Sequence, residues 1–387
     1  MLPSGFLSRK LIDLRAKTEE VARAVAEPRA VEVDRDRVWP THTFEALADA
    51  GLLGLQVPED LGGCGEGLLA LASLTEVLAQ SCSSSAICFG MHCVGTAVMA
   101  AKPTDYHREK YLTPIAQGRH ITTLSLSEPG TGVHFYLPNT RLSLDGNDFV
   151  VNGTKHFVTS GGRASSYVIS AVASNAAQGE FSCLVIDRDA PGVRFSGEWD
   201  GFGMRGNSSI TMNLENTRTP RASLLGEEGD QIWYVFEVIA PYFLVAMAGT
   251  YLGIAQAAFD YALNHVRTRV HSHSGESLSD ADVIQHHLGR MWSRLEATRQ
   301  LLYSAAYQAD AGNPEVMPAI LSAKAEVADV AVATVNDAMT LCGGIAYREN
   351  SVLTRLLRDV RASHVMAPTT DLLRLWTGRA LLGQPLL

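Results

Sequence analysis

Three glycines in the segment GFGMRG have the spacing of a loop that cradles a nucleotide phosphate. Gly201, Gly203 and Gly206 fit the pattern G-x-G-x-x-G, in which a strand precedes the loop and the N-terminus of a following helix receives the pyrophosphate. The next segment, SSITMNLENT, alternates like a strand. We therefore interpret the three glycines as a flexible turn between two strands and not as a nucleotide site.

Histidine and cysteine side chains offer two other kinds of chemistry. His92, in the segment FGMHCVG, could act as an acid or a base near neutral pH, whereas a satisfied core histidine on an amphipathic helix is the alternative. The sequence leaves both interpretations open. The six cysteines form no C-x-x-C pair and have no metal-ligand spacing, so we expect free buried thiols, no disulfide and no metal site.

Composition argues against several classes of partner. The 387 residues carry a net charge of −9 and no basic block, so nothing attracts nucleic acid or an anionic membrane surface. We find no apolar run of about 18 residues and expect no membrane insertion. The N-terminal segment MLPSGFLSRKLIDLRAK reaches charged residues too early for a secretory signal, so the sequence favours the cytoplasm.

The spacing of apolar residues divides the chain into three parts. Helical spacing predicts an N-terminal helical domain over residues 1–120. Period-two alternation, interrupted by Asp-Gly and Asn-Gly turns, predicts a middle antiparallel β-domain over residues 121–228. Helical spacing then returns and predicts a C-terminal helical bundle over residues 229–387, with apolar faces left for another subunit. The predicted fold class is mainly α with a central β-domain.

Four motifs occur in an order that resembles the acyl-CoA dehydrogenase superfamily. LSLSEPGTG (124–132) resembles the family's T-E-P-G-A-G loop, and NGTKHFVTS (152–160) resembles its N-G-K-K-W-I-T-N segment. GMRGNSSITMNLENTRTPRASLLGEEGD (203–230) is similar to the family's G-x-R-x-S-x-T strand and the turn after it. LCGGIAYRENSVLTRLLRDVRA (341–362) resembles its G-G-x-G-Y and R-D-A-R segment. The resemblance covers nearly the whole chain and implies the same three-part architecture.

The resemblance implies a flavin on the β-domain. A flavin ring needs a planar neighbour on one face, a small hydroxyl near N5 and donors to its carbonyls. By similarity, Phe157 replaces a tryptophan against the isoalloxazine and Thr159 keeps the contact to N5, while Leu126 and Ser127 lie along the pyrimidine end. An inward-facing strand residue is the alternative for Phe157. The implied cofactor is FAD, with FMN as the alternative.

The dinucleotide end of FAD is held in this family partly by a neighbouring subunit, which implies a homodimer or a homotetramer. Arg269 matches an arginine that reaches the pyrophosphate, although a solvated arginine at a helix end is an equal alternative. Asp371 replaces a usual glutamine, and an acid would repel a phosphate close by. The positions that match FAD contacts are Arg269, Gln285, Thr340, Gly343, Gly344, Thr369 and Asp371.

The carboxylate that removes the α-proton in this family is missing. Its usual place near the C-terminus is Ala367, and its other known place, on the first helix of the bundle, is Phe243. Glu237 and Asp371 are the nearest substitutes, but a solvated or structural carboxylate explains each of them better. Val133, followed by a histidine, stands where the family has a Ser-Asp pair that contacts the substrate.

Three functions are compatible with this pattern. The first is an FAD-dependent oxidoreductase that acts on an acyl thioester, carried by coenzyme A or an acyl-carrier protein, with a base that the sequence does not identify. The second is a flavin monooxygenase of the same fold, in which His92 would serve the oxygen chemistry. The third is an FAD-binding subunit of a hetero-oligomer whose homologous partner supplies the glutamate. We adopt the first as the working hypothesis.

Overall fold

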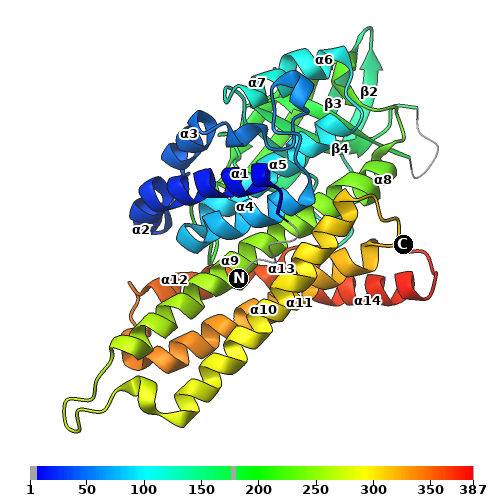
Figure 1. Ribbon diagram of the computed structural model, residues 1–387. Coiled ribbons are helices and arrows are strands. Elements are labelled where there is room, and N and C mark those ends of the chain that lie inside the picture. The colour runs from blue at the N-terminus through cyan, green and yellow to red at the C-terminus, as the bar shows by residue number, and fades with distance from the viewer. Residues whose placement is uncertain (1–6, 176–179, 387) are drawn as a thin grey trace.

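Helices enclose a central sheet in this structure. The computed structural model describes residues 7–175 and 180–386, so residues 1–6 of the N-terminal segment discussed above lie outside it. Figure 1 shows the N-terminal helices in blue and cyan, the strands at the upper right, and the C-terminal helices from green to red below them. The mainly α fold with a central β-domain is confirmed.

The N-terminal part is helical because its apolar residues recur at helical spacing. The helices α4 and α5 are apolar nearly all round, and this explains why almost every residue in them is buried. The helical elements are α1 (Arg9–Val21), η1 (Ala22–Ala26), α2 (Glu27–Arg35), α3 (Thr41–Asp49), η2 (Leu52–Gly54), η3 (Glu59–Leu61), α4 (Leu68–Ser81), α5 (Ser83–Ala101), α6 (Asp105–His107), η4 (Arg108–Leu112) and α7 (Thr113–Ala116).

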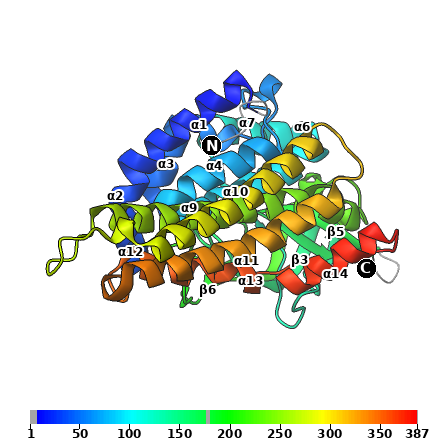
Figure 2. The ribbon, with the colours of Figure 1, turned by 60° about the horizontal axis from the view of Figure 1, so that its bottom comes forward.

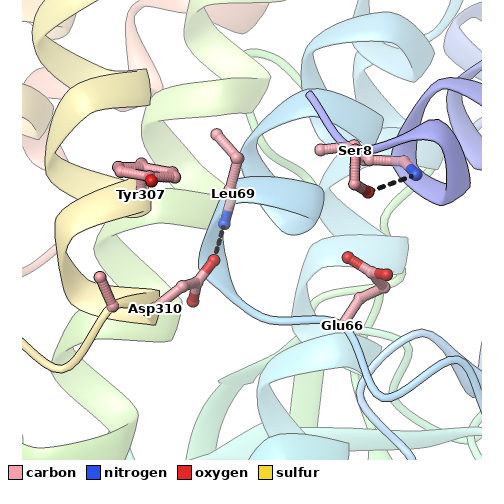
Figure 3. A pocket seen from close by; sticks show the side chains of 7 residues that line it. Ser8, Glu66, Leu69, Tyr307 and Asp310 are labelled. Atoms are coloured by element: carbon pink, nitrogen blue, oxygen red, sulfur yellow. Dashed lines mark hydrogen bonds between the residues drawn. The ribbon is translucent and has the colours of Figure 1, made fainter. Parts of the chain in front are cut away.

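A residue from the C-terminal part caps α4. The carboxylate of Asp310 accepts hydrogen bonds from the backbone N–H groups of Leu68, at 2.7 Å, and Leu69, at 2.9 Å. Figure 3 shows the bond to Leu69. A Cβ atom at Gly67 would lie 2.1 Å from Oδ1 of Asp310, so only glycine allows this approach. Asp310 therefore has a structural role, although it lines the pocket drawn in Figure 3.

The central sheet is mixed, which corrects the antiparallel arrangement expected from the sequence. Its order is β6-β7-β3-β2-β4-β5-β8, and β1 pairs in parallel with β4. Alternation shows which faces are buried but not the direction in which a strand runs, and β1 enters from the helical domain beside a strand that follows the β2–β3 hairpin. The strands are β1 (Thr122–Ser125), β2 (Arg141–Asp145), β3 (Asp148–Val158), β4 (Ser166–Val172), β5 (Phe181–Asp187), β6 (Val193–Ser196), β7 (Ile210–Pro220) and β8 (Leu224–Leu225).

Glycines 203 and 206 lie in the connection between β6 and β7, and β7 follows them, so the interpretation as a turn between strands is confirmed. A Cβ atom at Gly203 would lie 2.3 Å from the carbonyl oxygen of Arg358, and one at Gly206 would lie 2.3 Å from Val33. The backbone N–H of Met204 donates to the buried carboxylate of Asp359 at 2.6 Å. The glycines are needed for close packing against the other two parts of the chain.

The C-terminal bundle is built around α9, which packs against α4, α5 and α11. Figure 2 shows α9, α10 and α11 lying side by side, with the connection between α9 and α10 projecting from one end. The elements are α8 (Gln231–Trp233), η6 (Tyr234–Ile239), α9 (Ala240–Thr268), η7 (Leu278–Asp280), α10 (Asp282–Asp310), α11 (Met317–Cys342), η8 (Gly343–Ile345), α12 (Val352–Val360), α13 (Ala362–Val365) and α14 (Thr370–Leu381).

Two helical segments are long and apolar enough to cross a membrane, which the sequence search for apolar runs missed. They are Ser83–Ala101 and Gln231–Thr268, and no charged residue stands between Glu237 and Asp260. In each segment 89% of the most apolar 18-residue stretch is buried inside the protein. These helices are apolar because they form the core, since α9 contacts neighbours on most of its faces.

Candidate functional site

A β-bulge at the end of β3 exposes the ring of Phe157. The register between β3 and β7 shifts between Lys155, which pairs with Met212, and Val158, which pairs with Ile210, so β3 carries one extra residue. Phe157 adopts a left-handed backbone conformation with φ at 54°, and 67% of the residue is exposed. The structure thus excludes the inward-facing alternative for Phe157 and presents its ring to the outside of the sheet.

The other predicted residues of the β-domain gather around this bulge. Because the bulge interrupts the ladder, the backbone N–H of His156 donates to the carbonyl oxygen of Ser127 at 2.8 Å. Leu126 is buried beside it. The Oγ1 atom of Thr159 lies 3.2 Å from Oγ of Ser209, and because either hydroxyl can donate in this pair, the other keeps a proton for a further acceptor. An exposed aromatic ring and a small hydroxyl therefore lie two residues apart beside one loop.

A buried ion pair fixes the loop that contains Ser127 to β3. Lys155 donates to the carboxylate of Glu128 at 2.5 Å and to the carbonyl oxygen of Ser170 at 2.6 Å, and both charged side chains are almost fully buried. Glu128 also accepts from the backbone N–H groups of Asn139 and Thr140. Burial disfavours both charges and lowers the pKa of Lys155, but the ammonium and these hydrogen bonds hold the pKa of Glu128 below its ordinary value.

His92 has a structural role, which corrects its selection as a candidate catalytic residue. Its Nε2 atom lies 2.9 Å from the carbonyl oxygen of Leu53, and its Nδ1 atom accepts from the backbone N–H of Thr122 at 3.1 Å. The side chain is completely buried, and burial lowers its pKa to about 4. Since both ring nitrogens are bonded within the core and the ring is neutral at pH 7, His92 offers no free group to a ligand.

The segment that contains Ala367 is fixed from behind by two buried side chains. Lys324 of α11 donates to the carbonyl oxygens of Ser363, at 2.8 Å, and Pro368, at 3.0 Å. The hydroxyl of Tyr251 on α9 donates to Sδ of Met366 at 3.0 Å. Ala367 itself is half-buried, and its methyl side chain brings no ionisable group to this segment.

A cavity of about 850 Å³ lies at the start of α9, and neither Phe243 nor Ala367 is among its lining residues. One of its lining residues, Tyr242, precedes Phe243, and another, Ile320, lies one helical turn before Lys324. Glu237 also lines it, but as an exposed residue. No sequence pattern pointed to this cavity, because its lining comes from α9, from the connection between α10 and α11 and from the C-terminal tail: Leu68, Phe236, Glu237, Pro241, Tyr242, Ala309, Asp310, Gly312, Asn313, Pro314, Val316, Met317, Ile320, Pro385 and Leu386.

Five of the positions matched to FAD contacts gather at one end of the bundle. An ion pair of 2.9 Å between Arg290 of α10 and Asp337 of α11 fixes the antiparallel register of the two helices, which places the start of α10 beside the end of α11. The backbone carbonyl of Arg269 accepts from Leu278, and the side chain of Gln285 donates to Ser279 in the same hairpin. The five positions are Arg269, Gln285, Thr340, Gly343 and Gly344.

The remaining predicted positions lie elsewhere. Thr369 precedes α14, and Asp371 is exposed in the first turn of that helix. Both follow the segment held by Lys324, which lies about 20 Å along α11 from the bundle end. Val133 is half-buried in the loop between β1 and β2, where the neighbouring His134 contacts the hydroxyl of Tyr136 at 2.8 Å. The chain alone therefore brings the predicted positions together in three groups.

The described parts of the chain contain no disulfide and no candidate metal site. All six cysteines are free, and burial raises the pKa of Cys88 to about 12. Within residues 7–175 and 180–386, no group of three or more histidine, cysteine, aspartate or glutamate side chains could hold a metal ion.

Comparison with known proteins adds family matches along the chain. Residues 9–119 match the model of the acyl-CoA dehydrogenase N-terminal domain, residues 123–217 the middle domain and residues 243–382 the C-terminal domain. Cyclohexane-1-carbonyl-CoA dehydrogenase of Geobacter metallireducens is 30% identical over 96% of this chain and 98% of that protein. A probable acyl-CoA dehydrogenase of Bacillus subtilis, YngJ, is 28% identical over 95% of this chain and 97% of its own. The structure of butyryl-CoA dehydrogenase from Megasphaera elsdenii has a TM-score of 0.92, at 24% identity over 97% of this chain and 99% of that chain.

Proposed function

Because the chain belongs to the acyl-CoA dehydrogenase family, we propose that it is an FAD-dependent oxidoreductase that acts on an acyl thioester of coenzyme A or of an acyl-carrier protein. The observation that carries the proposal is the β-bulge at Phe157. It presents an aromatic ring, 67% exposed, beside the hydroxyl of Thr159 and the loop of Ser127. An aromatic ring held in this position offers a planar face on which a flavin ring can stack.

The described residues fit a flavin in a second respect. The buried hydroxyls of Ser125 and Thr370 have no hydrogen-bond partner in the structure, and they lie in the two segments that the resemblance places beside the cofactor. Buried hydroxyls without partners are rare, and a polar ligand would satisfy them. FAD is preferred to FMN because the positions at the bundle end, among them Arg269 and Gln285, match contacts to the adenylate half of FAD. FMN lacks this half and would leave these positions without a ligand.

We propose that the bundle end holds the cofactor of a second copy of this chain, in a homodimer or homotetramer. No Cβ atom at Gly343 or Gly344 would meet another atom of the chain, and Tyr347 nearby is 86% exposed. Trp292, on the exposed face of α10, is 53% exposed. Such apolar exposure supports contact with another subunit. A net charge of −9 and the core burial of both long apolar helices support a cytoplasmic location.

The cavity lined by Tyr242, the neighbour of Phe243 in the chain, is the proposed place of the acyl group. Its lining is mainly apolar, and its Tyr242 hydroxyl remains a neutral donor because burial raises its pKa to about 12. When bound, the flavin supplies a hydride acceptor. The chain supplies the apolar cavity and a donor, but no carboxylate at either family position, so the α-proton leaves to a different group or to water.

Replacing Phe157 by alanine is expected to raise the Kd for FAD about tenfold, because stacking on an aromatic ring contributes about 1–3 kcal/mol. The melting temperature of the protein without flavin should not change, since the ring makes little contact with the core. Titration of apoprotein followed by flavin fluorescence measures the Kd. Phe202→Ala is the matched control, because Phe202 is 64% exposed in a nearby loop. Equal Kd values for the two variants would contradict the proposed site.

Anaerobic photometry of the flavin-loaded protein tests the reaction. We expect at least one acyl thioester, from a panel that varies in chain length and branching, to bleach the flavin absorbance. If none does, and turnover needs reduced flavin and oxygen, the protein is a monooxygenase. The structure gives that alternative no support through His92, whose two nitrogens are bonded within the core. If bleaching appears only after a homologous chain with the family glutamate is added, the protein is a subunit of a hetero-oligomer.

A further inference from the structure

Lys324 is a buried cation without a buried anion. Its side chain is 0% exposed in the middle of α11. Nζ donates to the carbonyl oxygens of Ser363, at 2.8 Å, Pro368, at 3.0 Å, and Met366, at 3.5 Å. These three acceptors match the three N–H groups of an ammonium ion. In the described part of the chain no carboxylate lies within 4 Å of Nζ, as none forms an ion pair with it.

Such a cation does not serve stability. Removing an ammonium from water costs several kcal/mol, which uncharged carbonyl groups offset only in part. Burial lowers the pKa of Lys324 from its ordinary value to about 8. The unfolded chain therefore binds more protons than the folded chain between pH 8 and the ordinary lysine pKa, and the folded state gains stability as pH rises through this range. The cost of burying this charge is offset in part by three hydrogen bonds, all of them to one short stretch of backbone.

The three carbonyl groups all belong to the segment 363–368, which joins α13 to α14. This segment contains Ala367, the position of the missing carboxylate, and leads directly to Thr369 and the buried hydroxyl of Thr370. Ile320, one turn before Lys324 on α11, lines the proposed acyl cavity. The ammonium therefore holds the backbone that leads to the proposed flavin contacts Thr369 and Thr370.

We propose that Lys324 is a positioning residue: its ammonium sets the conformation of the segment 363–368, so that flavin binding follows the protonation of this one side chain. This inference rests on the proposed flavin site. The neutral amine has only two N–H donors for three carbonyl oxygens, so one carbonyl is released when the proton leaves. The segment then samples conformations that bind flavin less well.

Few other ionisable groups face this segment, and their partners are known. Tyr251 of α9 contacts Met366, and burial raises its pKa far above the working range. On the outer side, His364 of α13 pairs with Asp329 of α11 at 2.8 Å, and Arg374 of α14 closes the pair. Three other ionisable neighbours have partners away from this segment: Glu326 pairs with Arg374, Tyr303 of α10 donates to Glu76, and Asp359 of α12 accepts from the backbone of Met204. Asp371 is exposed on α14.

The test is the Kd for FAD, measured by fluorescence titration of apoprotein between pH 6.5 and pH 9.5. If only the protonated form binds well, a pKa of about 8 makes the Kd about tenfold higher at pH 9 than at pH 7. Lys324→Met should bind FAD weakly and without this pH dependence. Lys324→Arg stays charged at every pH of the titration, so it should lose the pH dependence and keep the tighter binding, with its guanidinium donating to the same carbonyl oxygens. The control is Lys17→Met, which removes an exposed lysine far from this segment in the sequence and should keep the wild-type profile.

Stability measurements separate this inference from a purely structural role. A structural lysine would let the melting temperature rise from pH 8 to pH 10 without changing the Kd for FAD. A wild-type Kd that does not vary with pH would overturn the inference even if Lys324→Met fails to fold, and so would a Lys324→Met variant that keeps the wild-type profile. Both results leave the proposed function intact. Failure of the wild-type protein to bind FAD at any pH would instead remove the proposed function, and this inference with it.

Discussion

Replacing Ala367 by glutamate is expected to increase the rate of flavin reduction by an acyl thioester at least 100-fold. A positioned general base contributes about 10²- to 10⁴-fold to a proton transfer. Ala367 stands where the family places that base, half-buried in the segment whose backbone Lys324 holds. A carboxylate there would be partly removed from water, which raises its pKa towards the working pH. The chain otherwise contains the cavity and the proposed ring-binding bulge that such a base requires.

The measurement is stopped-flow absorbance of the bound flavin after anaerobic mixing with the thioester. Ala367→Gln is the matched control, because it adds the same volume and polarity without a base, and it should stay at the wild-type rate. Phe243→Glu places a carboxylate at the second family position, next in the chain to Tyr242 of the cavity lining, and Phe243→Gln is its control. If neither glutamate variant is faster than its glutamine counterpart, the acyl group does not bind between these two positions, and the cavity has a different occupant.

The sequence predicted the elements of the fold better than their geometry. Alternation in NGTKHFVTS correctly predicts a strand, but it assigns Phe157 to a face without knowing of the bulge, which depends on pairing with the distant strand β7. The parallel pairing of β1 was equally invisible, because it depends on which strand β1 meets. Local pattern determines the type of an element, whereas its partners determine the direction of its side chains.

The candidate site shows the same limit. Spacing could not decide whether His92 is functional, because its partners, Leu53 and Thr122, come from segments far away in the sequence. Similarity to the family suggested the flavin residues but gave no indication of Lys324. Its proposed role depends on three backbone carbonyl acceptors, and a pattern of side chains in the sequence contains no information about such contacts. The residues matched to FAD stay predictions, since five of them lie at the bundle end, apart from the bulge at Phe157.

Removing one member of the buried pair Glu128–Lys155 is expected to destabilise the protein by about 3–5 kcal/mol, because the remaining charge stays buried without its partner. Lys155→Met leaves the carboxylate of Glu128 with uncharged donors only, the backbone N–H groups of Asn139 and Thr140 and the Thr140 hydroxyl. Glu128→Gln leaves the ammonium with the carbonyl and hydroxyl oxygens of Ser170. Flavin binding should fall as well, because Ser127 precedes Glu128 and the bulge at Phe157 follows Lys155. Urea unfolding measures the first effect, and the flavin content of the purified protein measures the second.

The double variant Glu128→Gln/Lys155→Met distinguishes the energy of the pair from the cost of an isolated charge. It should be several kcal/mol more stable than the sum of the two single losses predicts, because neither charge then remains buried alone. Surface pairs such as Arg188–Asp189 serve as the control, since their side chains are 41% and 79% exposed and their removal should change the stability little. Additive losses in the buried pair would show that Glu128 and Lys155 act separately, and the ion pair would then not hold the Ser127 loop against β3.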